Sequence, residues 1–187
     1  MILKTNFMKF PLILPMVLVF AFSAFAQKPA GDAPTAGVFA TTLDGKTITG
    51  ADLNGKVVVL NLWFINCPNC VEEIKLLNAL VDEYKDNKDV VFLAPATSSA
   101  KELVPFLKKN PFKYQVIPSA MNIILGKFGT IDKNGQITSP FPMHFVVDRT
   151  GKIALKMEGI KGVAAVRAEL KKQFPGSGAT SAPAKKP

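Results

Sequence analysis

The chain has 187 residues, of which 48% are hydrophobic and 20% are charged. This size and composition predict one globular domain with a sizeable core and extra segments at both ends. The formal net charge is +9, but its lysines are single or paired, as at Lys108–Lys109, with no basic run interleaved with aromatic residues, so we expect no nucleic-acid partner.

The first 26 residues have the pattern of an export signal. Lys4 and Lys9 precede an apolar stretch over 12–22, which is too short to cross a membrane comfortably. An Ala-Phe-Ala sequence at 24–26 then has the small–x–small pattern of a cleavage site. We therefore predict a cleaved signal peptide over 1–26 and an exported, periplasmic protein. An uncleaved signal that anchors the chain in the membrane is the alternative.

Composition sets the boundaries of the folded part. Residues 27–37 are rich in Ala, Pro and Gly and predict a flexible lead-in, and residues 38–174 hold the alternating and periodic apolar patterns of a domain. Residues 175–187 are almost entirely small residues, Pro and Lys, which cannot form a core. The sequence predicts that this tail is disordered.

The first elements lead to a buried strand and a helix. Residues 38–48 predict a β-hairpin with its turn at 44–45, followed by a second turn over 51–55. The aliphatic run that begins at Val57 is typical of a strand buried on both faces. A strong amphipathic helix is predicted from Pro68 to about 84, with proline at its first position.

The next two elements complete a strand–helix–strand unit. Residues 89–94 predict another buried strand, parallel to the first and reached by a right-handed crossover. Ser99 and Glu102 have the spacing of a capping box for a helix that runs to about 109. Pro105 lies within this helix, so we expect a kink or a late start.

The remainder of the domain consists of shorter elements. Its predicted parts are a short strand over 114–117, a short helix over 121–128 ended by Gly129, a turn-rich insertion or small hairpin over 132–140, an antiparallel hairpin formed by 143–148 and 152–157, and a closing helix over 162–174.

The element order, with C-x-x-C after the first core strand, is that of the thioredoxin fold. Residues 38–174 resemble the exported thioredoxin-like thiol–disulfide oxidoreductases of the TlpA/ResA type. The resemblance rests on N-L-W-F-x-x-C-P-x-C at 61–70, Glu73, F-P-M-H-F-V-V-D-R-T-G-K-I at 141–153, L-D-G-K at 43–46 and L-N-G-K-V-V-V-L-N at 53–61. It implies an α/β fold with a central mixed sheet flanked by helices, here with an added N-terminal β-hairpin.

Cys67 and Cys70 are the only cysteines in the chain. At the start of a helix, unpaired backbone N–H groups and the helix dipole favour a thiolate. We expect Cys67 to attack a partner's disulfide and Cys70 to resolve the mixed disulfide. The alternative is a permanent disulfide that only staples the helix, although so short a ring stabilises little.

Glu73 matches the acidic residue that, in TlpA/ResA-like proteins, is linked to proton transfer at the second cysteine. Thioredoxin itself often has an aspartate six residues before its first cysteine, where this chain has Asn61, which cannot titrate. The resemblance therefore assigns any carboxylate relay to Glu73. An ordinary glutamate stabilised by the helix dipole is the alternative.

A second set of residues is expected to contact the partner. Pro142 matches the cis-proline that faces the dithiol in this fold, with Phe141 presenting its backbone to the substrate. Met143 and Asn66 depart from the family's usual residues and are expected to affect partner choice. The full predicted set is Trp63, which would shield the dithiol, together with Asn66, Pro68, Asn69, Phe141, Pro142 and Met143.

A metal-binding alternative uses His144, the only histidine. Cys67, Cys70 and His144 could serve a copper chaperone of similar fold, but those proteins resemble C-x-x-x-C. Alternation along the strand puts His144 opposite Phe145, and we interpret it as packed away from the dithiol. Val71 after Cys70 excludes covalent haem attachment. We therefore expect neither a metal nor another cofactor.

The expected function follows from the resemblance. The protein would reduce disulfides in envelope proteins, including apocytochromes c that await haem, and would be re-reduced by a membrane thiol electron donor. We expect it to be a monomer. A thiol peroxidase would have Thr or Ser three residues before the reactive cysteine, where this chain has Phe64, so peroxidase activity is not expected.

Overall fold

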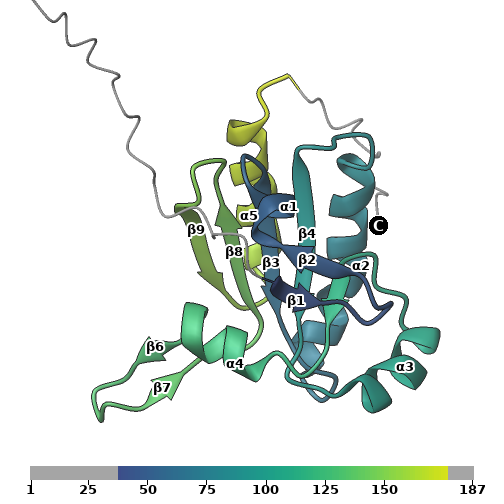
Figure 1. Cartoon of the computed structure of the whole chain (residues 1–187), viewed down its shortest axis with the longest axis vertical. Coiled ribbons are helices and arrows are strands. Elements are labelled where there is room, and N and C mark those ends of the chain that lie inside the picture. The colour runs from purple at the N-terminus through teal and green to yellow at the C-terminus, as the bar shows by residue number, and fades with distance from the viewer. Residues whose placement is uncertain (1–37, 177–187) are drawn as a thin grey trace, which may run out of the picture. The chain divides into compact units, whose positions relative to one another are not determined.

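A computed structural model describes residues 38–176 (Figure 1). The predicted signal peptide, lead-in and all but the first two residues of the predicted tail lie outside these described residues. The strands are β1 (Val38–Thr41), β2 (Thr47–Thr49), β3 (Val57–Leu62), β4 (Val90–Pro95), β5 (Gln115–Ile117), β6 (Thr130–Ile131), β7 (Ile137–Thr138), β8 (Met143–Val147) and β9 (Ile153–Glu158). The helices are α1 (Gly50–Leu53), α2 (Pro68–Glu83), α3 (Ala100–Lys109), α4 (Met121–Ile123), the π-helix η1 (Ile124–Phe128) and α5 (Gly162–Gln173).

A five-stranded mixed sheet in the order β5-β4-β3-β8-β9 forms the centre of the domain (Figure 1). β3 is the middle strand, parallel to β4 and antiparallel to β8. All six of its residues are buried, because both faces of the sheet are covered. The predicted mixed sheet and the predicted parallel strand–helix–strand unit are therefore both observed.

Two hydrophobic cores lie on opposite faces of this sheet. Alternation along β3 sends Val57 and Val59 into the core that includes residues of α2, α3 and α5. Val58 and Leu60 point into the second core, with residues of β1, α4 and η1. Cys67 and Cys70 belong to the first core, so the face of α2 and α5 is the one that carries the dithiol.

The short elements agree with the sequence except at two places. The predicted hairpins β1–β2, β6–β7 and β8–β9 are all antiparallel pairs. The stretch predicted as a second turn is the one-turn helix α1, because Thr49 and Asp52 form a capping box. The predicted late start of α3 is wrong, since the Ser99 capping box starts the helix at Ala100 and Pro105 lies inside it.

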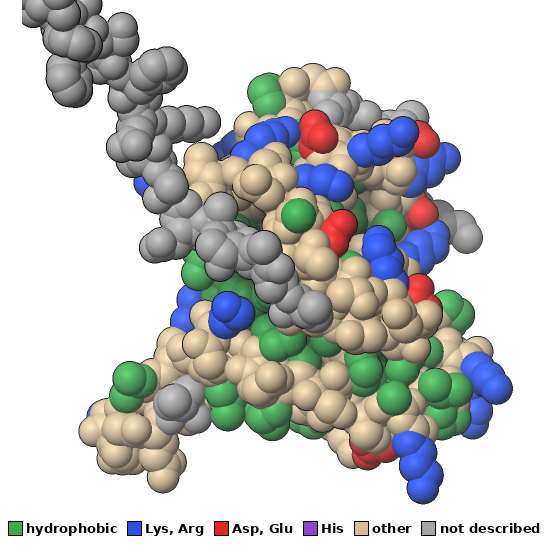
Figure 2. Space-filling view, in the orientation of Figure 1, with side chains coloured by type: hydrophobic (Ala, Val, Ile, Leu, Met, Phe, Trp, Pro, Cys, Tyr) green, Lys and Arg blue, Asp and Glu red, His purple; other side chains and the backbone are tan. Residues whose placement is uncertain are grey.

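The surface of the described part is mixed in character. On the face shown in Figure 2, Lys and Arg side chains lie at separate places among polar and hydrophobic atoms rather than in one band. Between residues 38 and 176, no helix has both the length and the apolar character needed to cross a membrane.

Candidate active site

Cys67 lies where β3 gives way to α2, and it is the N-cap residue of that helix. Its sulfur accepts a hydrogen bond from the backbone N–H of Cys70 at 3.2 Å, so one of the otherwise unpaired amides of the helix end points at Sγ. The two cysteines form a disulfide with an S–S distance of 2.07 Å. Cys67 is 6% exposed and Cys70 1%, so a partner can approach Cys67 but not Cys70.

Cys67 opens into a groove of about 440 Å³ between two segments. Phe141 forms part of one wall, and its ring meets that of Phe64 edge to face at 5.2 Å between centroids. The Phe141–Pro142 peptide bond is cis, as the resemblance implies. The residues that line the groove are Phe64, Asn66, Cys67, Pro68, Asn69, Ser139, Pro140 and Phe141.

Three of the predicted contact residues do not line this groove. Trp63 is fully buried and packs against Phe106 and Phe112, with ring centroids 5.9 and 5.4 Å away. Met143 is also fully buried, on the opposite face of the sheet from the dithiol, and Pro142 is buried as well. Alternation directs both side chains into the cores, and Trp63 shares its core with Cys67 and Cys70. Their predicted contact with a substrate stays a prediction.

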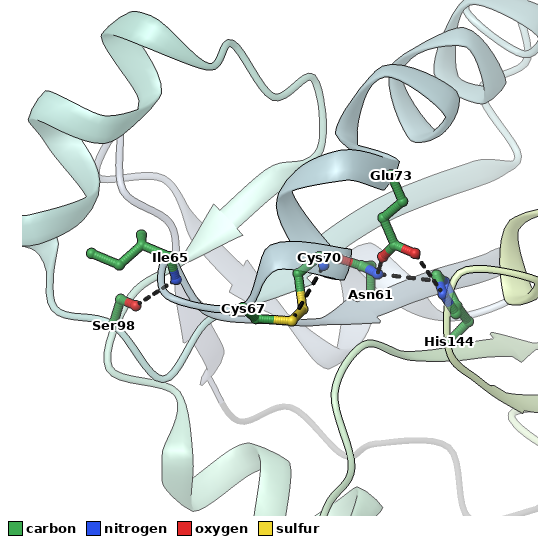
Figure 3. The surroundings of a disulfide bond; sticks show 7 residues. All are labelled: Asn61, Ile65, Cys67, Cys70, Glu73, Ser98 and His144. Carbon is green, nitrogen blue, oxygen red and sulfur yellow. Dashed lines mark hydrogen bonds and ion pairs between the residues drawn. A yellow bond between two sulfur atoms is a disulfide. The ribbon is translucent and has the colours of Figure 1, made fainter.

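Glu73 belongs to a buried polar cluster (Figure 3). Its Oε1 accepts a hydrogen bond of 2.7 Å from Nδ2 of Asn61. Its Oε2 lies 3.3 Å from Nε2 of His144, and the Asn61 amide nitrogen lies 3.4 Å from Nδ1 of the same ring. Glu73 and His144 are fully buried, and Asn61 is 1% exposed. Glu73 is therefore held in place by two strands rather than solvated at a helix surface.

The interpretation that His144 packs away from the site is wrong. The predicted alternation is correct, since Phe145 points into the second core, but His144 is on the face that carries the dithiol. β8 runs antiparallel to β3 with His144 opposite Asn61, and directly opposed residues have adjacent side chains. The strand pairing is the signal that would have revealed this cluster, and it joins residues 83 positions apart.

A metal site receives no support from this arrangement. Within residues 38–176, no group of three or more His, Cys, Asp or Glu side chains is placed to hold a metal ion. The imidazole of His144 faces Glu73 and Asn61, while Cys67 and Cys70 are bonded to each other. The residues proposed for copper are therefore engaged in other contacts.

Ser98 is a further residue that the sequence did not single out. It lies in the loop after β4 and is 8% exposed. Its hydroxyl accepts a hydrogen bond of 3.2 Å from the backbone N–H of Ile65, and the N–H of Thr97 donates to the carbonyl of Trp63. These bonds fix the segment that leads into Cys67 (Figure 3).

A thioredoxin fold in which one cysteine lies at a helix N-cap and lines a surface groove, with a second cysteine buried behind it, defines a thiol–disulfide oxidoreductase. Comparison with known proteins agrees with this class. The chain belongs to the AhpC/TSA family, whose model matches residues 29–156.

Two relatives and one solved structure show the similarity. The chain is 29% identical over 119 residues to the thiol–disulfide oxidoreductase ResA of Bacillus cereus, and this match covers 64% of each protein. It is 29% identical over 170 residues to the thiol:disulfide interchange protein DsbE of Pasteurella multocida, covering 80% of this chain and 84% of the relative. A thioredoxin family protein of Chlorobium tepidum has the same fold, with a TM-score of 0.60 and 23% identity over 75% of this chain and 96% of that one.

Proposed function

We propose that this protein is an exported reductase of disulfides in envelope proteins, with apocytochromes c among its substrates. The observation that supports this most is the asymmetry of the dithiol, since Cys67 opens into a groove and Cys70 is buried beneath it. An attacking thiol must reach its partner, whereas a resolving thiol needs to reach only the first cysteine.

In the proposed cycle the reduced Cys67 thiolate attacks a disulfide sulfur of the partner. The partner's S–S bond breaks, a mixed disulfide forms on Cys67, and the partner's second sulfur leaves as a thiolate. Cys70 loses its proton and attacks Cys67, so that the mixed disulfide breaks and the partner's first sulfur leaves as a thiolate. The Cys67–Cys70 disulfide seen in this structure remains. A membrane thiol donor then supplies the two electrons that restore the dithiol.

The groove suggests how a partner docks. Asn66, Pro68 and Asn69 are exposed beside Cys67, and Phe141 forms an apolar opposite wall. An extended segment of the partner would lie between these walls, with its disulfide over Cys67. Phe141 is half-buried against Phe64, so it offers a fixed surface and a backbone edge for pairing.

The cysteine roles can be tested by substitution. Cys67→Ser should abolish reduction of insulin disulfides with dithiothreitol as electron source, because no attacking thiol remains. Cys70→Ser should still attack but accumulate mixed disulfides, which are visible on non-reducing gels. Full activity in Cys67→Ser would rule out this mechanism. Ala79→Ser offers a matched control, because Ala79 is exposed on α2 and does not line the groove, and it should retain full activity.

The direction of electron flow is tested by the reduction potential of the dithiol. Equilibration with glutathione or dithiothreitol should give a value near that of thioredoxin, about −270 mV, if the protein is a reductant. A value near that of DsbA, about −120 mV, would instead identify an oxidant. The measurement separates the proposed direction from the exchange chemistry itself.

The proposed location and assembly have direct tests. Mass spectrometry of the protein recovered from a periplasmic fraction should show Gln27 as the first residue, as expected for cleavage after Ala26. Recovery of the full-length chain with the membrane would support the anchored alternative. Size-exclusion chromatography with light scattering should give the mass of a monomer.

A further inference from the structure

Residues 130–138, here called the β6–β7 arm, form a hairpin that stands apart from the central sheet (Figure 1). Within residues 38–176, its two strands pair only with each other. Ile131 is 76% exposed and packs in neither of the two cores formed by the described residues, although burial of an isoleucine side chain is favourable. An isolated two-stranded hairpin is marginally stable by itself, so the arm depends on contacts at its tip and ends.

These contacts hold the arm in one direction. At the tip, Oδ1 of Asp132 accepts two hydrogen bonds from backbone N–H groups of its own turn, at 2.8 and 2.9 Å. Just before the arm, the ring of Phe128 packs on that of Phe145, with 4.7 Å between centroids. Just after it, the ring of Phe141 meets that of Phe64 at 5.2 Å. The arm is therefore a fixed projection of the domain.

The second strand of the arm, β7, leads directly into the wall of the Cys67 groove. The residues that follow β7 are Ser139, Pro140 and Phe141, and all three line that groove. The arm is thus continuous, through the backbone, with the surface over which a partner's disulfide must lie. Because a strand advances about 3.3 Å per residue, a partner segment of about five residues spans the distance from Phe141 to Ile137.

The backbone of the arm has an open edge. The N–H of Asp132 donates to the carbonyl of Gln136 at 2.8 Å, so the backbone groups of these two residues face each other across the hairpin. Successive residues of an antiparallel strand direct their N–H and C=O groups to alternate sides. Those of the next pair, Ile131 and Ile137, therefore point away from the hairpin. An extended peptide can add to such an edge as a further strand.

We propose that the β6–β7 arm extends the substrate site: an extended segment of the disulfide-containing partner leaves the Cys67 groove and pairs as a third strand with the open edge of β7. This proposal rests on the proposed function and deepens it, because it names the kind of segment that the site selects. The described residues that line the groove include no Asp, Glu, Lys or Arg, and the charged residues of the arm, Asp132 and Lys133, lie at its turn. The segment is therefore uncharged and rich in β-branched residues, which favour strands, and its apolar side chains continue the face that carries Ile131.

The test follows the attack of Cys67 on peptides that each carry one cysteine as a mixed disulfide with thionitrobenzoate. The reduced Cys70→Ser protein is used, because it keeps the attacking thiol but cannot resolve the product. Cys67 bonds to the peptide sulfur, the peptide–thionitrobenzoate S–S bond breaks, and the coloured thionitrobenzoate leaves as a thiolate. One peptide has long flanks of alternating valine and threonine on both sides of its cysteine. A second peptide has the same neighbours but no further flanks.

At low peptide concentration we expect the long peptide to react about tenfold faster than the short one, the factor that one or two added backbone hydrogen bonds supply. Replacement of residues 131–137 by Asn-Gly closes a two-residue turn between Thr130 and Thr138, which are already paired. This shortened arm should remove the advantage of the long peptide and leave the rate of the short one unchanged. Equal rates for both peptides with the full arm, or an advantage that survives the shortening, would overturn the proposal.

Two proline variants test the edge itself. Ile137→Pro removes the N–H that points away from the hairpin and leaves the pairing of β6 with β7 intact, so it should slow the long peptide but not the short one. Lys133→Pro is the matched control, because Lys133 follows Asp132 in the turn closed by the N–H of Gly135, where proline is favoured. It should keep the advantage of the long peptide. The same loss in both variants would contradict pairing at the edge of β7.

The short peptide reports whether the fold and the attacking thiol of each variant are intact. None of these measurements requires a natural partner or an electron donor. Loss of insulin reduction by the wild-type protein would therefore count against the proposed function, while the ratio of the two peptide rates decides the role of the β6–β7 arm.

Discussion

A methyl group at Gly162 would collide with the imidazole of His144. An ideal Cβ there lies 2.8 Å from Nε2 and 2.9 Å from Cγ, whereas ordinary van der Waals contact begins at 3.4 Å. The ring is fully buried between Asn61 and Glu73, so it can move only by leaving the carboxylate. Alanine would otherwise favour the helix by up to about 1 kcal/mol. Overpacking costs about 1–3 kcal/mol, so Gly162→Ala should destabilise the protein by roughly 1–2 kcal/mol.

Urea denaturation, monitored by circular dichroism, measures this change through the unfolding midpoint at constant slope. Gly126→Ala is the matched control, because a Cβ at Gly126 meets nothing within 4 Å, and it should be neutral or slightly stabilising. Replacing His144 by Ala should remove most of the cost of Gly162→Ala, as a double-mutant cycle would show. The reasoning is refuted if Gly162→Ala is as stable as Gly126→Ala, or if its cost persists without the ring.

Three further predictions concern other buried or capping groups. Because burial raises the pKa of Tyr114, its contribution to stability is present below about pH 10 and is lost as the pH rises above that value. Tyr114→Phe should remove this loss of stability at alkaline pH. Since the Tyr114 hydroxyl has no hydrogen-bond partner, the substitution should also raise the free energy of unfolding by about 1 kcal/mol near neutral pH. Urea midpoints measured at neutral pH and at alkaline pH check both effects. Ser98→Ala leaves the N–H of Ile65 without its acceptor, so it should lower the free energy of unfolding by about 1–3 kcal/mol. Hydrogen exchange at the Ile65 amide should become faster. Ser98→Thr, which keeps the hydroxyl, is the control. The hydrogen bond from Ser99 lowers the pKa of Glu102 from 4.5, so the ionised carboxylate stabilises the fold above pH 4.5 and this stabilisation is lost as the pH falls. The stability difference between wild type and Glu102→Gln should therefore shrink on acidification. A difference that stays constant with pH would contradict this.

Local signals predicted much of the site. The aliphatic run of β3 and the proline after Cys67 predict a buried strand that ends at a helix N-terminus, and the structure has both. The exposed neighbours Asn66 and Asn69, predicted to contact a partner, line the groove beside Cys67. Each of these features depends on residues close in sequence, so periodicity and capping chemistry were sufficient to predict them.

Side-chain direction at the strand ends was harder to predict. Trp63 precedes Cys67 by four residues and Met143 follows the cis-proline, but Trp63 is enclosed by Phe106 and Phe112 and Met143 lies in the opposite core. Which face a strand residue occupies depends on what covers each face. A residue that adjoins an active-site motif in the sequence can therefore be absent from the surface of the site.

The sequence by itself determined that two cysteines lie at the start of a helix and that Glu73 follows on the same face. It could not determine that His144 joins them. That contact depends on the antiparallel pairing of β3 with β8, which sets His144 opposite Asn61 and beneath α2. Register across a sheet is fixed by long-range packing, and here it turns an isolated strand histidine into the partner of the buried carboxylate.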